Sequence, residues 1–144
     1  MPDPGEFELS RWKPFFWIAA AYNCLAAAVA LLAPEFHVDQ FFGAATAFEG
    51  PVAQMNTQAF WVSVLLFGVG YGIVARDPGR NHGILLLAAL GKTYVFVVFT
   101  ASWLGGSMRA LALAGGIGDL IFAAGFVWFL WRFDVRRGRS WAGG

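Results

Sequence analysis

Residues 82–104 read HGILLLAALGKTYVFVVFTASWL, and Lys92 is the only Asp, Glu, Lys or Arg among them. A helix of about 20 predominantly apolar residues is long enough to cross the hydrocarbon core of a bilayer. Hydrocarbon offers no hydrogen-bond partners, so a segment that crosses it must satisfy its own backbone groups. The stretch therefore predicts a membrane helix that carries one charged side chain near its middle.

Three other stretches of the chain have the same apolar character. With residues 82–104, the predicted spans cover about 14–33, 57–75, 82–104 and 109–132, and an outer loop covers 34–56. The turn Gly105-Gly106-Ser107 is short enough to make the third and fourth helices antiparallel neighbours. We therefore predict a single all-α membrane domain over residues 1–144, folded as a four-helix bundle.

The composition excludes several classes of protein. Hydrophobic residues make up 58% of the chain and charged residues 13%, whereas a soluble domain carries about 25% charged residues. A net charge of +1 excludes a nucleic-acid binder that neutralises phosphates. One cysteine, Cys24, excludes a disulfide framework and a multi-cysteine metal site. The lipid bilayer is thus the first expected partner, and we expect no metal and no cofactor.

The Lys and Arg residues between the spans predict the orientation. Arg11, Lys13, Arg76, Arg80, Arg132, Arg136, Arg137 and Arg139 fall on the side of the termini, against Arg109 alone on the other side. Positive residues favour the cytoplasmic side, so both termini are predicted to be cytoplasmic. Ala28-Val29-Ala30 is similar to a signal-peptidase site. However, a net acidic segment precedes it and the apolar stretch continues to Leu32, so we expect no cleavage.

Two ionisable residues fall near the middle of predicted spans and are the first candidates for a site. At 1.5 Å of rise per residue, Lys92 lies about 15 Å and Asp119 about 20 Å from the cytoplasmic ends of their helices. An unpaired charge at that depth costs roughly 2.5–3.5 kcal/mol. Because the third and fourth helices are neighbours, we predict an ion pair between Lys92 and Asp119.

Asn23 in the first span and Tyr71 in the second complete the predicted polar cluster. Small residues share the helix faces of these side chains, and Gly68 and Gly72 show the spacing at which membrane helices approach closely. The sequence therefore places Asn23, Tyr71, Lys92 and Asp119 in the interior of the bundle. We take these four residues as the candidates for ligand binding.

Three functions are compatible with this cluster. The interpretation we favour is a protein that binds or transports a small molecule or a proton, because charges within membrane helices mark such sites. In the alternative, the protein is an accessory or assembly subunit of a larger membrane complex, and the ion pair only fixes the register of the helices. A second copy of the chain, in a homo-oligomer, is another partner that the sequence allows. An intramembrane enzyme with Lys92 as a Schiff-base residue is a third hypothesis. His37 and His82 fall on opposite sides of the membrane, which disfavours a shared haem or metal site.

The outer loop has two interpretations. It carries Phe36, Phe41, Phe42 and Phe48 among acidic residues. We favour a short helix in the outer membrane interface with its phenylalanines among the lipid headgroups. The alternative is a lid over the outer mouth of the bundle, because long loops are often functional.

Several short motifs resemble small four-span bacterial membrane proteins of the DoxX-like group. These motifs are Tyr22-Asn23, Gly70-Tyr71-Gly72, Asp77-Pro78, Gly91-Lys92 and Gly118-Asp119-Leu120-Ile121. The resemblance implies a four-helix bundle and a multi-pass location in the bacterial inner (cytoplasmic) membrane. Some members of that group are linked to redox systems, but the residues of a redox centre are not evident in this sequence.

Overall fold

The computed structural model describes the backbone of residues 4–43 and 50–140 and the side chains of residues 7–43 and 50–133. Within these ranges the secondary structure is helical, and no strand is present. The helices are α1 (Pro4–Ser10), α2 (Lys13–Leu32), α3 (Pro34–Phe42), α4 (Pro51–Arg76), α5 (His82–Leu104) and α6 (Ala110–Ser140). Four segments, Phe7–Leu32, Pro51–Arg76, His82–Leu104 and Ala110–Phe133, are long and apolar enough to cross a membrane. The predicted all-α fold with four such helices is confirmed.

Two of the long helices extend beyond the apolar stretches that predicted them. Helix α4 begins at Pro51 rather than near Thr57, and α6 continues to Ser140 rather than ending near Arg132. Pro51 suits the first turn of a helix, where its missing N–H is not needed. Gln54 and Asn56 in that first part of α4 are polar but do not break a helix. Hydropathy therefore located the apolar part of each helix and not its ends.

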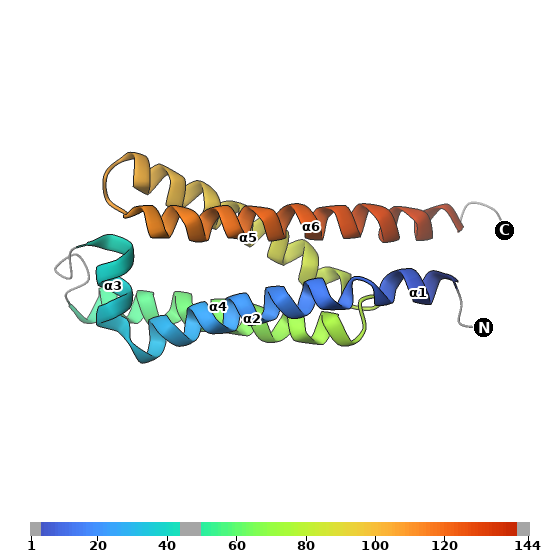
Figure 1. Ribbon diagram of the computed structural model, residues 1–144, viewed down its shortest axis with the longest axis horizontal. Coiled ribbons are helices and arrows are strands. Elements are labelled where there is room, and N and C mark those ends of the chain that lie inside the picture. Colours follow the sequence, from blue (N-terminus) through green and yellow to red (C-terminus); the bar gives the residue numbers. More distant parts are fainter. Residues whose placement is uncertain (1–3, 44–49, 141–144) are drawn as a thin grey trace.

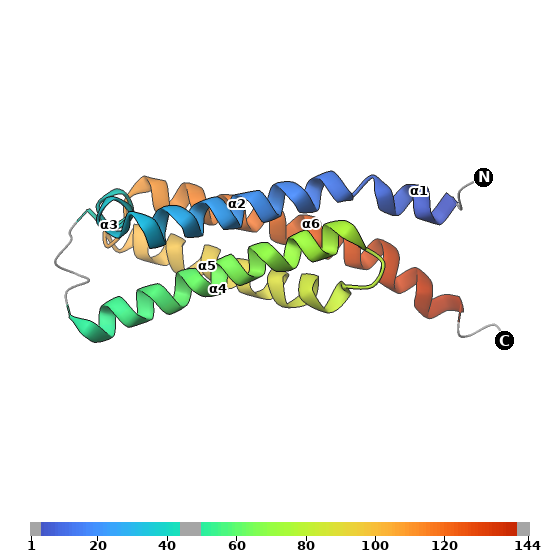
Figure 2. The same ribbon diagram turned by 90° about the horizontal axis from the view of Figure 1, so that it is seen from below.

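The helices form two antiparallel hairpins, with α2 packed on α4 and α5 packed on α6 (Figures 1 and 2). The predicted pairing of the third and fourth spans is thus confirmed, through a turn in which Gly106 has a φ of 74°. Helix α1 and the end of α6 lie at one end of the bundle, the terminal end, and α3 lies at the other, the α3 end. The orientation in a membrane remains a prediction, and the side chains of Arg136, Arg137 and Arg139 lie outside the described residues.

At the terminal end, a cluster of rings joins the two hairpins. This aromatic cluster consists of Trp12, Phe15 and Phe16 of the first hairpin and Phe126 and Phe129 of α6, with ring centroids 5.1–6.3 Å apart. Phe16, Phe126 and Phe129 are fully buried. Ring pairs at these separations add to the stability that burial alone provides. The aromatic cluster is therefore one of the contacts that hold the two hairpins together.

Glycines allow the close approaches that this packing requires. A Cβ atom added at Gly125 of α6 would lie 2.3 Å from Cζ of Phe15, and one added at Gly68 of α4 would lie 2.7 Å from Sγ of Cys24. Both positions therefore need the absence of a side chain. The spacing of Gly68 and Gly72 predicted a close approach of helices without naming the partner, and at Gly68 the partner is α2.

Helix α3 lies across its end of the bundle, where it contacts α2 of its own hairpin and α6 of the other (Figures 1 and 2). It ends at Gly43, which has a φ of 71°. The Arg109 backbone N–H then donates a 2.8 Å hydrogen bond to the Phe41 carbonyl, and the Arg109 side chain lies 3.5 Å from Asp39. The outer segment therefore contains the expected short helix, fixed to the start of α6. Phe41 packs against Trp61 and Phe99 of the bundle, so the prediction that it faces the headgroups is wrong. Phe36 is exposed on it, and Phe48 lies outside the described residues.

Candidate functional site

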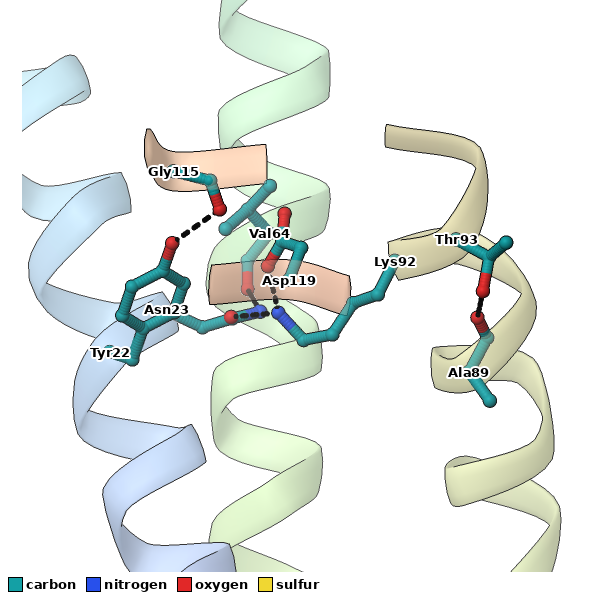
Figure 3. Close-up of polar contacts among 8 residues, drawn as sticks. All are labelled: Tyr22, Asn23, Val64, Ala89, Lys92, Thr93, Gly115 and Asp119. Carbon is teal, nitrogen blue, oxygen red and sulfur yellow. Dashed lines mark hydrogen bonds and ion pairs between the residues drawn. The ribbon is translucent and has the colours of Figure 1, made fainter. Parts of the chain in front are cut away.

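Lys92 is buried where the four long helices meet. Its Nζ donates a 2.9 Å hydrogen bond to Oδ1 of Asn23 on α2 and forms an ion pair with Oδ1 of Asp119 on α6 (Figure 3). Only 6% of Lys92 is exposed. The contact predicted between Lys92 and Asp119 is therefore present. Each charge has its counter-charge beside it, which is the condition under which charges are tolerated in an apolar interior.

Asn23 connects this ion pair to the remaining helix. Its Nδ2 donates a 3.1 Å hydrogen bond to the backbone carbonyl of Val64 on α4 (Figure 3). The Asn23 amide thus accepts a hydrogen bond from Lys92 of α5 and donates one to the Val64 carbonyl of α4. One side chain of α2 therefore joins three helices. Since α6 is attached through Asp119, a continuous polar network links all four long helices.

Aromatic rings surround the ammonium group of Lys92. Its Nζ lies 5.2 Å from the ring centroid of Tyr22, 5.4 Å from that of Phe122 and 5.7 Å from that of Tyr71. A cation within about 6 Å of a ring face is attracted by the ring quadrupole. The structure thus brings the four sequence candidates together. The ring of Tyr71 lies beside the ammonium group and is fully buried against Phe126.

Tyr22 is a site residue that sequence reasoning did not select. Its hydroxyl donates a 2.8 Å hydrogen bond to the Gly115 carbonyl on α6, one turn from Asp119 (Figure 3). A Cβ atom at Gly118 would lie 2.8 Å from that hydroxyl, so this glycine provides room for the tyrosine. The available signal in the sequence was the row Gly115, Gly118 and Gly125 on α6, which leaves room for the large side chains of Tyr22 and Phe15.

A cavity of about 320 Å³ reaches this polar cluster. Asn23, Tyr71, Lys92 and Asp119 line one part of it. Half of the other lining residues are aromatic, namely Tyr22, Phe41, Phe60, Trp61, Phe67, Tyr94 and Phe99. Ligand pockets in proteins are typically apolar clefts of 300–1,000 Å³ with a few placed polar groups. The cavity meets this description at the lower limit of size.

His37 lies behind the outer wall of the cavity. It is 3% exposed, and its ring packs 4.5 Å from the ring of Phe41 and 4.6 Å from that of Trp61. Within the described ranges, neither ring nitrogen has a hydrogen-bond partner. Because burial disfavours the charged imidazolium, the pKa of His37 lies below its ordinary value. Protonation of His37 therefore opposes the packing of α3 against the cavity wall.

The described residues contain no group of three His, Cys, Asp or Glu side chains placed to hold a metal ion. Cys24 is a free, partly buried thiol beside Gly68. What the arrangement offers is therefore polar recognition: one carboxylate, one ammonium and one amide at the end of an aromatic cavity.

Comparisons with known proteins add no relative of this chain. The chain matches no family model, and neither a curated protein nor a solved structure gives a match.

Proposed function

We propose that this protein is a multi-pass membrane protein of the bacterial inner membrane that binds or transports a small molecule or a proton at Lys92 and Asp119. The single observation that carries the proposal is the cavity of about 320 Å³ that reaches both charged side chains. A pair that served only to fix helix register would need no such space. Asn23 and Tyr71 are the supporting residues of the same site.

The charges of the pair provide the means of binding. Lys92 and Asp119 neutralise each other when the site is empty, so the apolar surroundings can hold them. A ligand or proton that reaches the carboxylate can replace part of the contact with the ammonium. Charged pairs within membrane helices act in this way in transporters.

The test is to identify what co-purifies with the protein. The wild type, Lys92→Met, Asp119→Asn and Thr93→Ala are purified in lipid nanodiscs, and their organic extracts are compared by mass spectrometry. Thr93 is the matched control, since it neighbours Lys92 in sequence but its hydroxyl bonds the Ala89 carbonyl of its own helix. We expect a molecule enriched over bulk lipid in the wild type and in Thr93→Ala, and lost in Lys92→Met.

Proton transport is measured separately, because a transported proton leaves no extract. Proteoliposomes with a pH-sensitive dye inside report the decay of an imposed pH gradient. If Lys92→Met and Asp119→Asn match the wild type in both the extracts and the proton flux, the pair is structural and the proposal is wrong.

A further inference from the structure

The position of the cavity mouth limits which molecules can reach the site. Phe60 and Ser63 on α4 and Gly91 and Tyr94 on α5 line the cavity and are also exposed on the outside of the bundle. The cavity therefore opens sideways between α4 and α5. These four residues lie near the middle of their helices, which run over Pro51–Arg76 and His82–Leu104.

A sideways opening at mid-helix faces hydrocarbon when the helices span a bilayer. A molecule that arrives through it must first dissolve in the membrane, which excludes free ions and strongly polar solutes. The aromatic wall then favours a ligand that is itself aromatic, because ring pairs add to the stability gained by burial. The mouth and the wall thus both point to a lipid-soluble aromatic molecule.

The polar end of the cavity determines the headgroup of the ligand. The ion pair is neutral overall, so a charged headgroup would leave an uncompensated charge in an apolar site. Oδ1 of Asp119 accepts from Lys92, and the Asp119 side chain lines the cavity. A carboxylate has two oxygens and can accept about four hydrogen bonds, so its capacity exceeds this one contact. The group that a ligand meets there is thus an acceptor with negative charge, and a neutral hydroxyl donor suits it because O–H···O⁻ hydrogen bonds are short and strong.

We infer that the site takes a lipid-soluble phenol, which arrives between α4 and α5 and donates its hydroxyl hydrogen to the carboxylate of Asp119. This inference rests on the proposed function and specifies its ligand class. The ring of the phenol lies among the aromatic side chains of the wall, and its alkyl part extends toward the mouth beside Gly91.

The probe is a 4-alkylphenol with a photoreactive diazirine in its alkyl chain, applied to the full-length protein in nanodiscs. Cross-linked residues are mapped by peptide mass spectrometry. We expect labelling on α4 and α5 around Trp61 and Tyr94. Unlabelled 4-hexylphenol should compete at least about tenfold better than 4-hexylanisole, which lacks the donor, because a hydrogen bond to a charged group is lost. The phenol should also compete better than 4-hexylbenzoate, which is charged, by a similar factor.

A pair of glycine variants tests the route. A Cβ atom at Gly91 or at Gly83 meets nothing within 4 Å, so both positions on α5 accept a side chain. Gly91 lines the cavity mouth, whereas Gly83 is absent from its lining. Gly91→Phe should abolish the labelling around Trp61, and Gly83→Phe should leave it unchanged.

The possible results separate this inference from the proposed function. If the anisole or the benzoate competes as well as the phenol, the ligand class is wrong. The proposed site then stands only if Lys92→Met weakens all three competitors. If labelling is absent, or is spread evenly over the exposed helix faces and insensitive to Gly91→Phe, the lateral route and the phenol are both wrong. The proposed function is in that case decided by its own extract and flux measurements.

Discussion

A double-mutant cycle on Lys92 and Asp119 tests whether the two side chains form one energetic unit. In Lys92→Met the Asp119 carboxylate loses its counter-charge in a site where only 15% of its side chain is exposed. Removing one partner of a buried pair costs about 3–5 kcal/mol. In Asp119→Asn the ammonium loses its counter-charge, and roughly 2.5–3.5 kcal/mol is the cost of a lone charge in a membrane helix. Additive effects would therefore destabilise the double variant by about 6 kcal/mol or more.

The structure predicts a much smaller effect in the double variant. With both charges gone, the main loss is the 2.9 Å hydrogen bond that Asn23 accepts from Lys92, which costs about 1–3 kcal/mol for the unsatisfied oxygen. The coupling between the two sites should thus be about 3 kcal/mol or more.

The assay is reversible unfolding in mixed micelles, followed by tryptophan fluorescence, with Thr93→Ala as the control for folding. The free energy of unfolding is compared among the wild type, the two single variants and the double variant. A double variant whose loss equals the sum of the single losses within about 0.5 kcal/mol would refute the reasoning. In that event the contact in Figure 3 contributes no coupling energy.

Three further predictions follow from other parts of the structure. Burial lowers the pKa of His37, so the unfolded chain takes up a proton below about pH 6.5 that the folded chain excludes. Stability should therefore fall by up to about 1.4 kcal/mol per pH unit as the pH decreases from there to the lower pKa of the folded state. Unfolding titrations of His37→Phe should lack this slope, and an unchanged slope contradicts the assignment. Gly125→Ala should destabilise the protein by about 1–3 kcal/mol, since the added Cβ would lie 2.3 Å from Phe15. Gly83→Ala, in open space, should be neutral or stabilising. If thermal unfolding ranks the two variants the other way, the rings of the aromatic cluster can rearrange at little cost in stability. Native mass spectrometry from mild detergent should give a monomer or a homodimer, and a stable complex with other proteins would favour the accessory-subunit hypothesis instead.

The fold and the ion pair could be predicted because each depends on a strong local signal. Four long apolar stretches determine four helices, and the short turn at Gly105-Gly106-Ser107 makes the last two neighbours. A lysine and an aspartate at similar depth on adjacent helices have few other partners. Their contact therefore followed from energetic cost alone.

The rest of the site depends on interactions that leave little trace in the sequence. Asn23 donates to the Val64 carbonyl and Tyr22 to the Gly115 carbonyl, and every residue carries such an acceptor. The cavity depends on how far two packed hairpins separate, which side-chain volumes determine jointly. Phe41 belongs to its wall because α3 crosses the bundle, and hydropathy does not give the direction of a short helix.

The attachment of the two hairpins has a mechanical consequence. Interlocked rings at the terminal end resist sliding, because densely packed interiors transmit strain rather than absorb it. Any rotation of one hairpin against the other about the aromatic cluster would give a displacement that increases with distance from that pivot. The hydrogen bond between Lys92 and Asn23 and the contact of Arg109 with α3 oppose such a rotation farther along the bundle. The width of the gap between α4 and α5 thus depends on contacts along the whole molecule, so a substitution remote from the gap can alter it.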